Sequence, residues 1–145
     1  MLGRVTDVPE RVCELGFPGP LRDRLVAAVL REEKTATSSL MVEWEEDAEP
    51  LPHVGERQAV LDSGGCPVAV IEVVAVDLIR LGDADLRLAL EEGEGFRSVA
   101  EWREAHEQFW NGEGRPHLRA PSAWRLDDDT QVVVERFRLV QRLPG

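Results

Sequence analysis

The chain has 145 residues, 43% hydrophobic and 31% charged, which is typical of one ordinary globular domain. No run approaches the roughly 18 apolar residues that span a bilayer, and the charged N-terminus is not a signal peptide, so we expect a cytoplasmic protein without a membrane partner. The formal net charge of −11 argues against an extended nucleic-acid footprint, although it leaves room for a small neutral substrate.

The first third of the chain predicts mainly helix. In the lead over 1–15, Val8, Val12 and Leu15 are spaced for one helical face. After a turn at 16–20, apolar residues recur at helical spacing and predict a helix over 20–32, without the glycine that usually ends one. A polar connection over 34–39, a strand over 40–44 and an acidic loop over 45–55 follow.

The rest of the chain alternates between strand and helix patterns. Strands are predicted at 57–61, 67–79 and 130–140, the first two joined by an Asp-Ser-Gly-Gly hairpin and the second bending near Ala75. Asp83 is expected to cap a short helix that carries Leu86, Ala89 and Leu90. A second helix should begin at the capping box of Ser98 and Glu101, and a long loop should cover 111–129.

The order of these elements indicates the fold class. About five strands and three or four helices occur without strict alternation, which favours an α+β fold. We therefore expect one domain over 1–145, a small mixed β-barrel with helices on its rim.

A polar segment at 34–39 holds the first candidate site. Lys34 is the only lysine among 17 basic residues, and a desolvated lysine can lose its proton whereas arginine cannot. The hydroxyl of Thr37, three residues later, becomes a nucleophile only when a base activates it. The alternative is that the hydroxyls of this segment satisfy backbone groups and that the single lysine reflects a biased composition.

Acidic and aromatic residues supply further candidates. Glu94 stands between two glycines, which permit close approach of a ligand, although a charged run such as 91–95 is usually a solvated loop. His106 shares a helix face with aromatic residues, which favours a packed histidine. The tryptophans can stack a base or fill the core. The spacing of His, Cys13 and Cys66 matches no zinc pattern, so neither a metal nor a cofactor is expected.

Two segments together carry a family resemblance. These are 33–40, Glu-Lys-Thr-Ala-Thr-Ser-Ser-Leu, and 92–103, which runs from Glu-Gly-Glu-Gly to Ser-Val-Ala-Glu-Trp-Arg. With weaker matches at 15–20, 50–55 and 134–137, the chain resembles the ASCH-domain family, whose fold is similar to the PUA β-barrel. Glu32 departs from the family pattern, which commonly has glycine there, and the loop over 111–129 lies outside its minimal form.

What the resemblance implies is a cleft between the lysine-threonine segment and the acidic loop. Some small family members hydrolyse N4-acetylcytidine and related acylated cytosines, and by position their catalytic residues would be Lys34, Thr37 and Glu94. Substrate-binding candidates are Thr35, Ser38, Ser39, Trp44, Trp102 and Arg103.

The mechanism stays open between two forms. In one, neutral Lys34 activates Thr37 and protonated Glu94 serves the leaving group; in the other, charged Lys34 polarises the carbonyl and Glu94 activates water. Two other functions remain open. Because relatives are reported as ribonucleases, the chain can be a module that binds or cleaves short RNA through a basic patch of Arg22, Arg24, Arg31, Arg115, Arg119 and Arg125. It can also be a non-catalytic sensor of a nucleotide-like ligand. The oligomeric state is not predicted.

Overall fold

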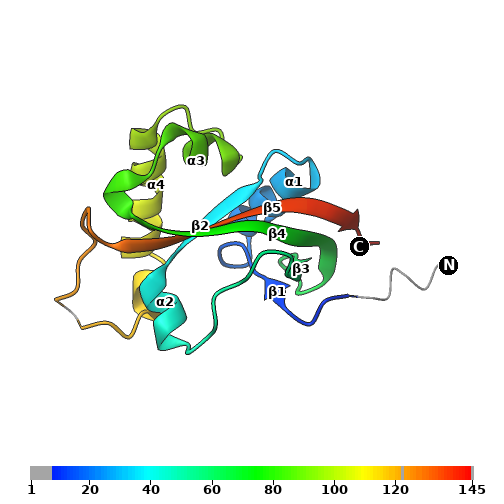
Figure 1. Ribbon diagram of the computed structural model, residues 1–145, viewed down its shortest axis with the longest axis horizontal. Coiled ribbons are helices and arrows are strands. Elements are labelled where there is room, and N and C mark those ends of the chain that lie inside the picture. Colours follow the sequence, from blue (N-terminus) through cyan, green and yellow to red (C-terminus); the bar gives the residue numbers. More distant parts are fainter. Residues whose placement is uncertain (1–7, 122, 145) are drawn as a thin grey trace.

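The computed structural model describes residues 8–121 and 123–144 and has a five-stranded mixed sheet (Figure 1). Its strand order is β1-β3-β4-β5-β2, and only β1 and β3 run parallel. Because β1 and β2 form two separate edges, the sheet is open and not the closed barrel that was expected. The α+β class is confirmed. The strands are β1 Val12–Cys13, β2 Ala36–Leu40, β3 Arg57–Leu61, β4 Pro67–Arg80 and β5 Gln131–Arg142.

Four α-helices and two short 3-10 turns accompany this sheet in the described residues. In Figure 1, α3 and α4 lie together at one end of the sheet, and α1 lies nearer the end that holds both termini. No described helix has both the length and the apolar character needed to cross a membrane. The helices are α1 Pro20–Leu30, α2 Met41–Glu46, α3 Leu86–Glu91 and α4 Val99–Asn111, and the turns are η2 Leu81–Asp83 and η3 Arg115–His117.

The long hairpin follows the sequence pattern closely. Strands β3 and β4 pair in an antiparallel ladder across the predicted turn. Strand β4 bends where it was expected to, because its register with β5 shifts between Val73 and Ala75. Such a bulge lets one strand serve both ends of a curved sheet.

Two segments differ from the prediction. The strand expected at 40–44 is wrong: the polar segment before it forms β2, and 41–46 is helical. Burial explains this, since Ala36 and Leu40 are fully buried while Leu40 opens α2, where its N–H donates to the Glu43 carboxylate at 3.1 Å. The helix expected in the lead is also wrong over its described part, where Val12 and Cys13 pair with β3. Residues 1–7 of that lead lie outside the described residues.

The helix ends show which of the predicted capping residues are used in the structure. Glu32 adopts the left-handed φ of 61° just after α1, the conformation for which glycine is normally used. Asp85, not Asp83, caps α3 by accepting the Leu88 N–H at 2.9 Å. Ser98 caps α4 as expected by accepting the Glu101 N–H, although the Glu101 carboxylate accepts a hydrogen bond from the Arg97 N–H instead of the Ser98 N–H.

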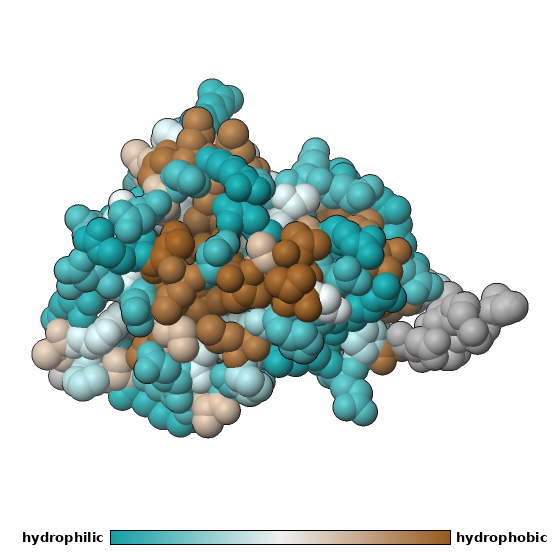
Figure 2. Space-filling view, viewed as in Figure 1, coloured by the Kyte–Doolittle hydropathy of each residue, from teal (hydrophilic) through white to brown (hydrophobic). Residues whose placement is uncertain are grey.

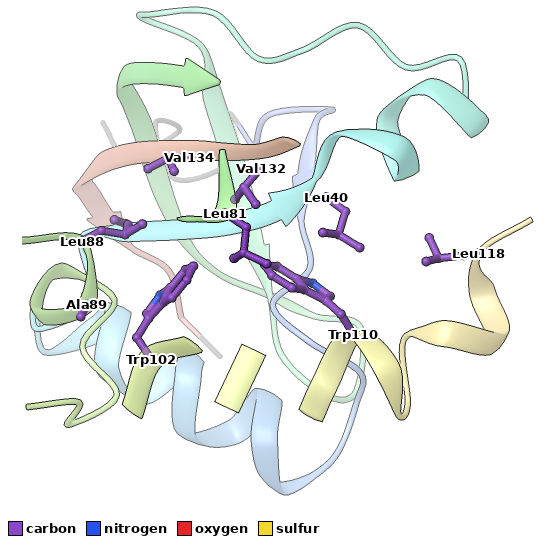
Figure 3. Close-up of a cluster of buried hydrophobic side chains, with 10 residues drawn as sticks. Leu40, Leu81, Leu88, Ala89, Trp102, Trp110, Leu118, Val132 and Val134 are labelled. Carbon is purple, nitrogen blue, oxygen red and sulfur yellow. The ribbon is translucent and has the colours of Figure 1, made fainter. Parts of the chain in front are cut away.

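The apolar residues form two clusters on different parts of the sheet. One joins α1 to β3, β4 and Phe137 of β5. The other joins α3 and α4 to β2 and β5, and Figure 3 shows Trp102 and Trp110 of α4 pointing into it, toward Leu81 and Leu40. Not all apolar side chains are covered: Figure 2 shows a hydrophobic band across the middle of one face, where β4 crosses in Figure 1, and Val74 and Leu78 of β4 are exposed.

Candidate active site

Lys34 is buried at the junction between α1 and β2. Its backbone N–H donates to the Ala28 carbonyl at 3.1 Å, and its side chain is only 1% exposed. The Nζ donates to the Ala36 carbonyl at 2.9 Å, the Glu92 carbonyl at 3.2 Å and Glu92 Oε1 at 3.4 Å. All three partners are acceptors, which matches the three donors of an ammonium group. The geometry around Nζ therefore fits an ammonium group with all three donors engaged.

Glu92, which follows α3, is the residue at the centre of this hydrogen-bond network. Its side chain is 2% exposed, and its Oε2 accepts Ser38 Oγ at 2.6 Å and Trp102 Nε1 at 2.7 Å. Its Oε1 faces Lys34 and, at 3.3 Å, His106 Nε2. Burial alone would raise the pKa of Glu92, but the Lys34 charge, His106 and the Ser38 hydrogen bond lower that pKa to about 2. Glu92 is therefore a buried carboxylate that stays ionised.

The protonation of His106 follows from its two neighbours. Its Nδ1 lies 2.8 Å from the Trp102 carbonyl, which can only accept, so Nδ1 carries a proton. Nε2 lies 3.3 Å from the ionised Glu92, a contact that favours a proton on this nitrogen too and hence the imidazolium form of the ring. Although burial would lower the pKa of His106, the bond and charge of Glu92 raise it above its usual value. The ring also stacks on Trp102, with centroids 4.3 Å apart, as expected for a packed histidine.

Gly93 brings the acidic loop against the lysine segment. It has a φ of +69°, and a Cβ there would lie 2.5 Å from the Glu33 carbonyl oxygen and 2.6 Å from Lys34 N. Only a residue without a side chain permits this approach of two backbones. The contact continues with the Thr35 N–H, which donates to the Glu91 carbonyl at 2.8 Å. Gly93 thus fixes the distance between Lys34 and both neighbouring carboxylates.

Glu94 occupies a different environment from Glu92, two residues earlier. Its side chain is 21% exposed, and its Oε2 lies 3.9 Å from Lys34 Nζ, beyond hydrogen-bond distance. Burial raises the pKa of Glu94 above its usual value, and the nearby Lys34 charge only partly opposes this. Glu94 can therefore exchange a proton closer to neutral pH than an ordinary carboxylate.

These groups border a cavity of about 860 Å³ between α1 and α4. Four of the predicted site residues line it: Lys34, Thr37, Ser38 and Glu94. Thr37 and Ser38 belong to opposite faces of a strand, and both can border the cavity because β2 is an edge of the sheet. The Thr37 hydroxyl forms no hydrogen bond within 8–121 and 123–144, so it is available to a ligand.

The remaining predicted site residues lie outside the cavity lining. Thr35 lies just before β2. The Ser39 hydroxyl accepts a hydrogen bond from Trp44 Nε1–H at 2.9 Å, and the Arg11 guanidinium lies over the Trp44 ring. Arg103 pairs with Glu107 at 3.0 Å and with Asp128 at 2.8 Å. Trp102 is a core residue that meets the site through its hydrogen bond to Glu92 and its contacts with His106.

Sequence reasoning missed Glu92 and His106. Glu92 sits in the same acidic run as Glu94, where nothing marks one carboxylate as buried. A signal for His106 does exist, since it follows Trp102 by four residues on the same helix face. Taken separately, the two residues have the pattern of a solvated loop residue and of a packed histidine, and nothing in the sequence pairs them.

Glu92, Glu94 and His106 also form a cluster whose potential ligand atoms lie within 4.8 Å of one another. A cation there would compete with the Lys34 ammonium and with the proton on His106 Nε2. Glu92 already accepts from four donors, which uses its lone-pair sites. The donor set therefore suits a network of protons better than a metal ion.

Comparisons with known proteins agree with this fold. A structure of a protein from Enterococcus faecalis, EF3133, has 24% identity and a TM-score of 0.78, covering 92% of this chain and 78% of its own. An ASCH domain from Lactobacillus crispatus has 26% identity and a TM-score of 0.73, covering 96% and 86%. A ZmASCH variant from Zymomonas mobilis has 10% identity and a TM-score of 0.55, covering 91% and 73%, and shares the fold alone.

No curated protein matches the chain. The family model described as the ASCH domain matches residues 14–141, which include every residue of the buried network and every residue that lines the cavity. The chain therefore belongs to the ASCH domain family.

Proposed function

We propose that this protein is a hydrolase that cleaves the amide bond of an acylated cytosine nucleoside such as N4-acetylcytidine. One observation carries the proposal: a buried Lys34–Glu92–His106 network lies beside a cavity that is also lined by Thr37 and Glu94. The Thr37 hydroxyl has no hydrogen-bond partner among the described residues, and the carboxyl of Glu94 has a raised pKa. The Lys34 charge can stabilise an oxyanion, the Thr37 hydroxyl can donate a hydrogen bond to it, and Glu94 can transfer a proton, all in one place.

Of the two mechanisms left open by the sequence, the contacts favour the one with charged Lys34. As a base Lys34 would need a free lone pair on Nζ, but Nζ faces three acceptors, one of them the ionised carboxylate of Glu92, whose pKa is about 2. As an ammonium it can instead stabilise negative charge. Its two longer contacts, 3.2 and 3.4 Å to Glu92, are those that a substrate oxygen can replace most easily.

The free edge of β2 supplies a further donor. Phe137 N–H donates to the Thr35 carbonyl, so in this antiparallel ladder Thr35 and Thr37 face β5, and Ala36 and Ser38 point their backbone groups away from it. The contact of Lys34 with the Ala36 carbonyl agrees with this alternation. The Ser38 N–H therefore points to the free edge beside the cavity, where it can donate to an oxyanion.

The reaction then follows in balanced steps. Ionised Glu94 takes a proton from water, and the hydroxide adds to the acyl carbonyl to form a tetrahedral oxyanion. Lys34, the Thr37 hydroxyl and the Ser38 N–H stabilise that oxyanion. The C–N bond breaks as Glu94 returns its proton to the cytosine N4, which releases cytidine and the carboxylic acid.

Incubation of the pure protein with N4-acetylcytidine tests the proposal, with cytidine and acetate as expected products. Glu94→Gln should lower kcat by about 10² to 10⁴, the usual contribution of an acid–base group, without loss of folded protein. Glu113→Gln is the matched control, since it removes one carboxylate from an exposed position outside the cavity lining. No turnover, or equal turnover in Glu94→Gln, contradicts the proposal; binding without turnover would instead favour the sensor.

The arginine pattern gives the RNA alternative less support. Of the arginines expected to form a basic patch, Arg22 is buried and donates to the carbonyls of Leu15 and Gly16. Arg119 donates to the Glu46 carbonyl. Only Arg24 and Arg31 border the cavity, so the candidates do not form one continuous surface for a chain of phosphates.

A further inference from the structure

The wall of the cavity that α1 provides has an ordered pattern. Arg24, Ala27 and Ala28 of α1 and Arg31, which follows its last residue in a helical conformation, all line the cavity, and their spacing of three, four and seven residues places them on one helical face. The two alanines leave room in the middle of this wall. An arginine stands at each end of it.

The two arginines differ in how they are engaged. Arg31 Nε donates to Glu33 Oε1 at 2.7 Å. Arg24 is exposed and forms neither a hydrogen bond nor an ion pair within residues 8–121 and 123–144. Its acidic neighbour Asp23 accepts a hydrogen bond from Ser63 Oγ at 2.7 Å. The guanidinium of Arg24 thus lines the cavity with all its donors available.

Arg24 is also correctly placed relative to the buried network. The backbone N–H of Lys34 donates a hydrogen bond to the Ala28 carbonyl, so Lys34 lies next to the middle of the cavity wall that α1 forms. Arg24 precedes Ala28 by four residues, about 6 Å along the helix axis at 1.5 Å per residue. The Arg24 charge is still felt by Glu94, whose pKa it lowers slightly against the larger effect of burial. A ligand whose amide reacts beside Glu94 can therefore extend along the two alanines toward Arg24.

We propose that the cavity takes a phosphorylated ligand, an N4-acylated cytidine 5′-monophosphate, whose phosphate Arg24 binds. A guanidinium pairs with phosphate oxygens in a bidentate, charge-assisted geometry. Phe96 and Phe109, which line the same cavity, offer aromatic faces to the base. Among the described residues that line the cavity, Arg24 is the one arginine without a partner, which suits one terminal phosphate better than the repeated phosphates of RNA. The acylated base in this inference rests on the proposed function, whereas the phosphate site is tested separately from it.

Calorimetric titration with cytidine and with cytidine 5′-monophosphate tests the phosphate site without any hydrolysis. The monophosphate should bind about 10- to 100-fold more tightly, the range for a hydrogen-bonded charge pair. Arg24→Gln should abolish this preference and leave cytidine affinity unchanged. Arg97→Gln, the same change at an exposed arginine outside the cavity lining, should keep the preference.

The opposite results are equally distinct. Equal affinity for the two compounds, no binding of either, or an unaltered preference in Arg24→Gln overturns the phosphate site. An unphosphorylated cytidine oligonucleotide that binds more tightly than the monophosphate, and does so equally in Arg24→Gln, overturns it in favour of RNA. Loss of the monophosphate preference in Arg24→Gln, together with no hydrolysis of N4-acetylcytidine or its 5′-phosphate, would retain the phosphate site and reject the proposed hydrolase.

Discussion

Two buried carboxylates, Glu92 and Glu135, lie in contrasting surroundings. Glu92 faces the Lys34 ammonium and the His106 imidazolium, and its pKa falls to about 2 despite burial. Glu135 on β5 is also buried, but burial raises its pKa, opposed mainly by a hydrogen bond from the neutral Gln58 amide. Nearby Glu56, which accepts from Gln58 Nε2 at 2.7 Å, raises the pKa of Glu135 further.

This contrast shows that the partners of a buried carboxylate, more than its depth, decide its charge. The same rule separates Glu92 from Glu94 within one loop, since Glu94 is farther from Lys34 and lacks the ring of donors. A permanently ionised group can anchor a site, whereas a group of raised pKa can carry a proton during turnover. The following predictions test that division, beginning with the largest effect.

Removal of the Lys34 charge should have the largest effect on stability. Lys34→Met keeps the side-chain length but leaves Glu92 buried with only part of its compensation, which should cost about 3–5 kcal/mol in free energy of unfolding. Urea denaturation at pH 7 measures this cost. The double variant Lys34→Met with Glu92→Gln should recover part of it, and a Lys34→Met protein within 1 kcal/mol of wild type would contradict the ion-pair account.

The glycines of the acidic loop provide a matched pair. Gly95→Ala should cost about 1–2 kcal/mol, because its φ of +86° is strained for alanine although no atom lies within 4 Å of the added Cβ. Gly93→Ala should cost roughly 1–3 kcal/mol more, since its Cβ would meet the backbone of Glu33 and Lys34. Equal unfolding free energies for the two variants would mean that the close approach at Gly93 does not matter.

The two buried carboxylates should respond to pH in opposite directions. Because the folded pKa of Glu92 is depressed, the stabilisation it contributes is present above pH 4.5 and is lost as the pH falls toward 2, by about 3 kcal/mol at about 1.4 kcal/mol per pKa unit. The folded pKa of Glu135 is raised, so its contribution is present below pH 4.5 and is lost as the pH rises through the folded pKa.

Unfolding curves of wild type, Glu92→Gln and Glu135→Gln between pH 2 and 7 separate these slopes. The difference between wild type and Glu92→Gln should shrink on acidification. As the pH rises, wild type should instead lose unfolding free energy relative to Glu135→Gln. Slopes of the same sign in both comparisons would refute the contrast.

His106 should give the smallest effect. Its folded pKa is raised, so the stabilisation from the imidazolium–Glu92 contact is complete below pH 6.5 and is lost as the pH rises through the folded pKa. His106→Gln should remove a pH-dependent contribution on the order of 1 kcal/mol, seen in thermal unfolding from pH 6 to 9. His53→Gln, at a histidine whose side chain is 77% exposed, should leave that dependence unchanged.

Local patterns predicted the hairpin, α1, α4 and the closing strand, because their apolar spacing and turn residues are decided within a few positions of the chain. They failed at β2, since Ala-Thr-Ser-Ser-Leu has few strand-forming residues and gains its order by pairing with β5. The open form of the sheet depends on which strands meet at the edges, and periodicity within a strand does not specify that.

The sequence predicted which segments form the candidate site, but it did not predict which side chains contact one another there. Lys34 and Thr37 were found from residue type and family resemblance, and both line the cavity. Glu92 was missed because its burial arises from contacts with Ser38 and Trp102, which lie 54 and 10 residues away in sequence. Trp44 and Arg103 carry attractive chemistry for a nucleoside, but other side chains already engage them.

A ¹³C-detected NMR titration of the glutamate carboxyl groups tests the central division most directly. We predict that the Glu92 resonance stays at its ionised position until the pH falls close to 2, while those of Glu94 and Glu135 titrate above pH 4.5. A Glu92 carboxyl that becomes protonated above pH 4.5, or a Glu94 carboxyl that remains ionised to pH 2, would contradict the account.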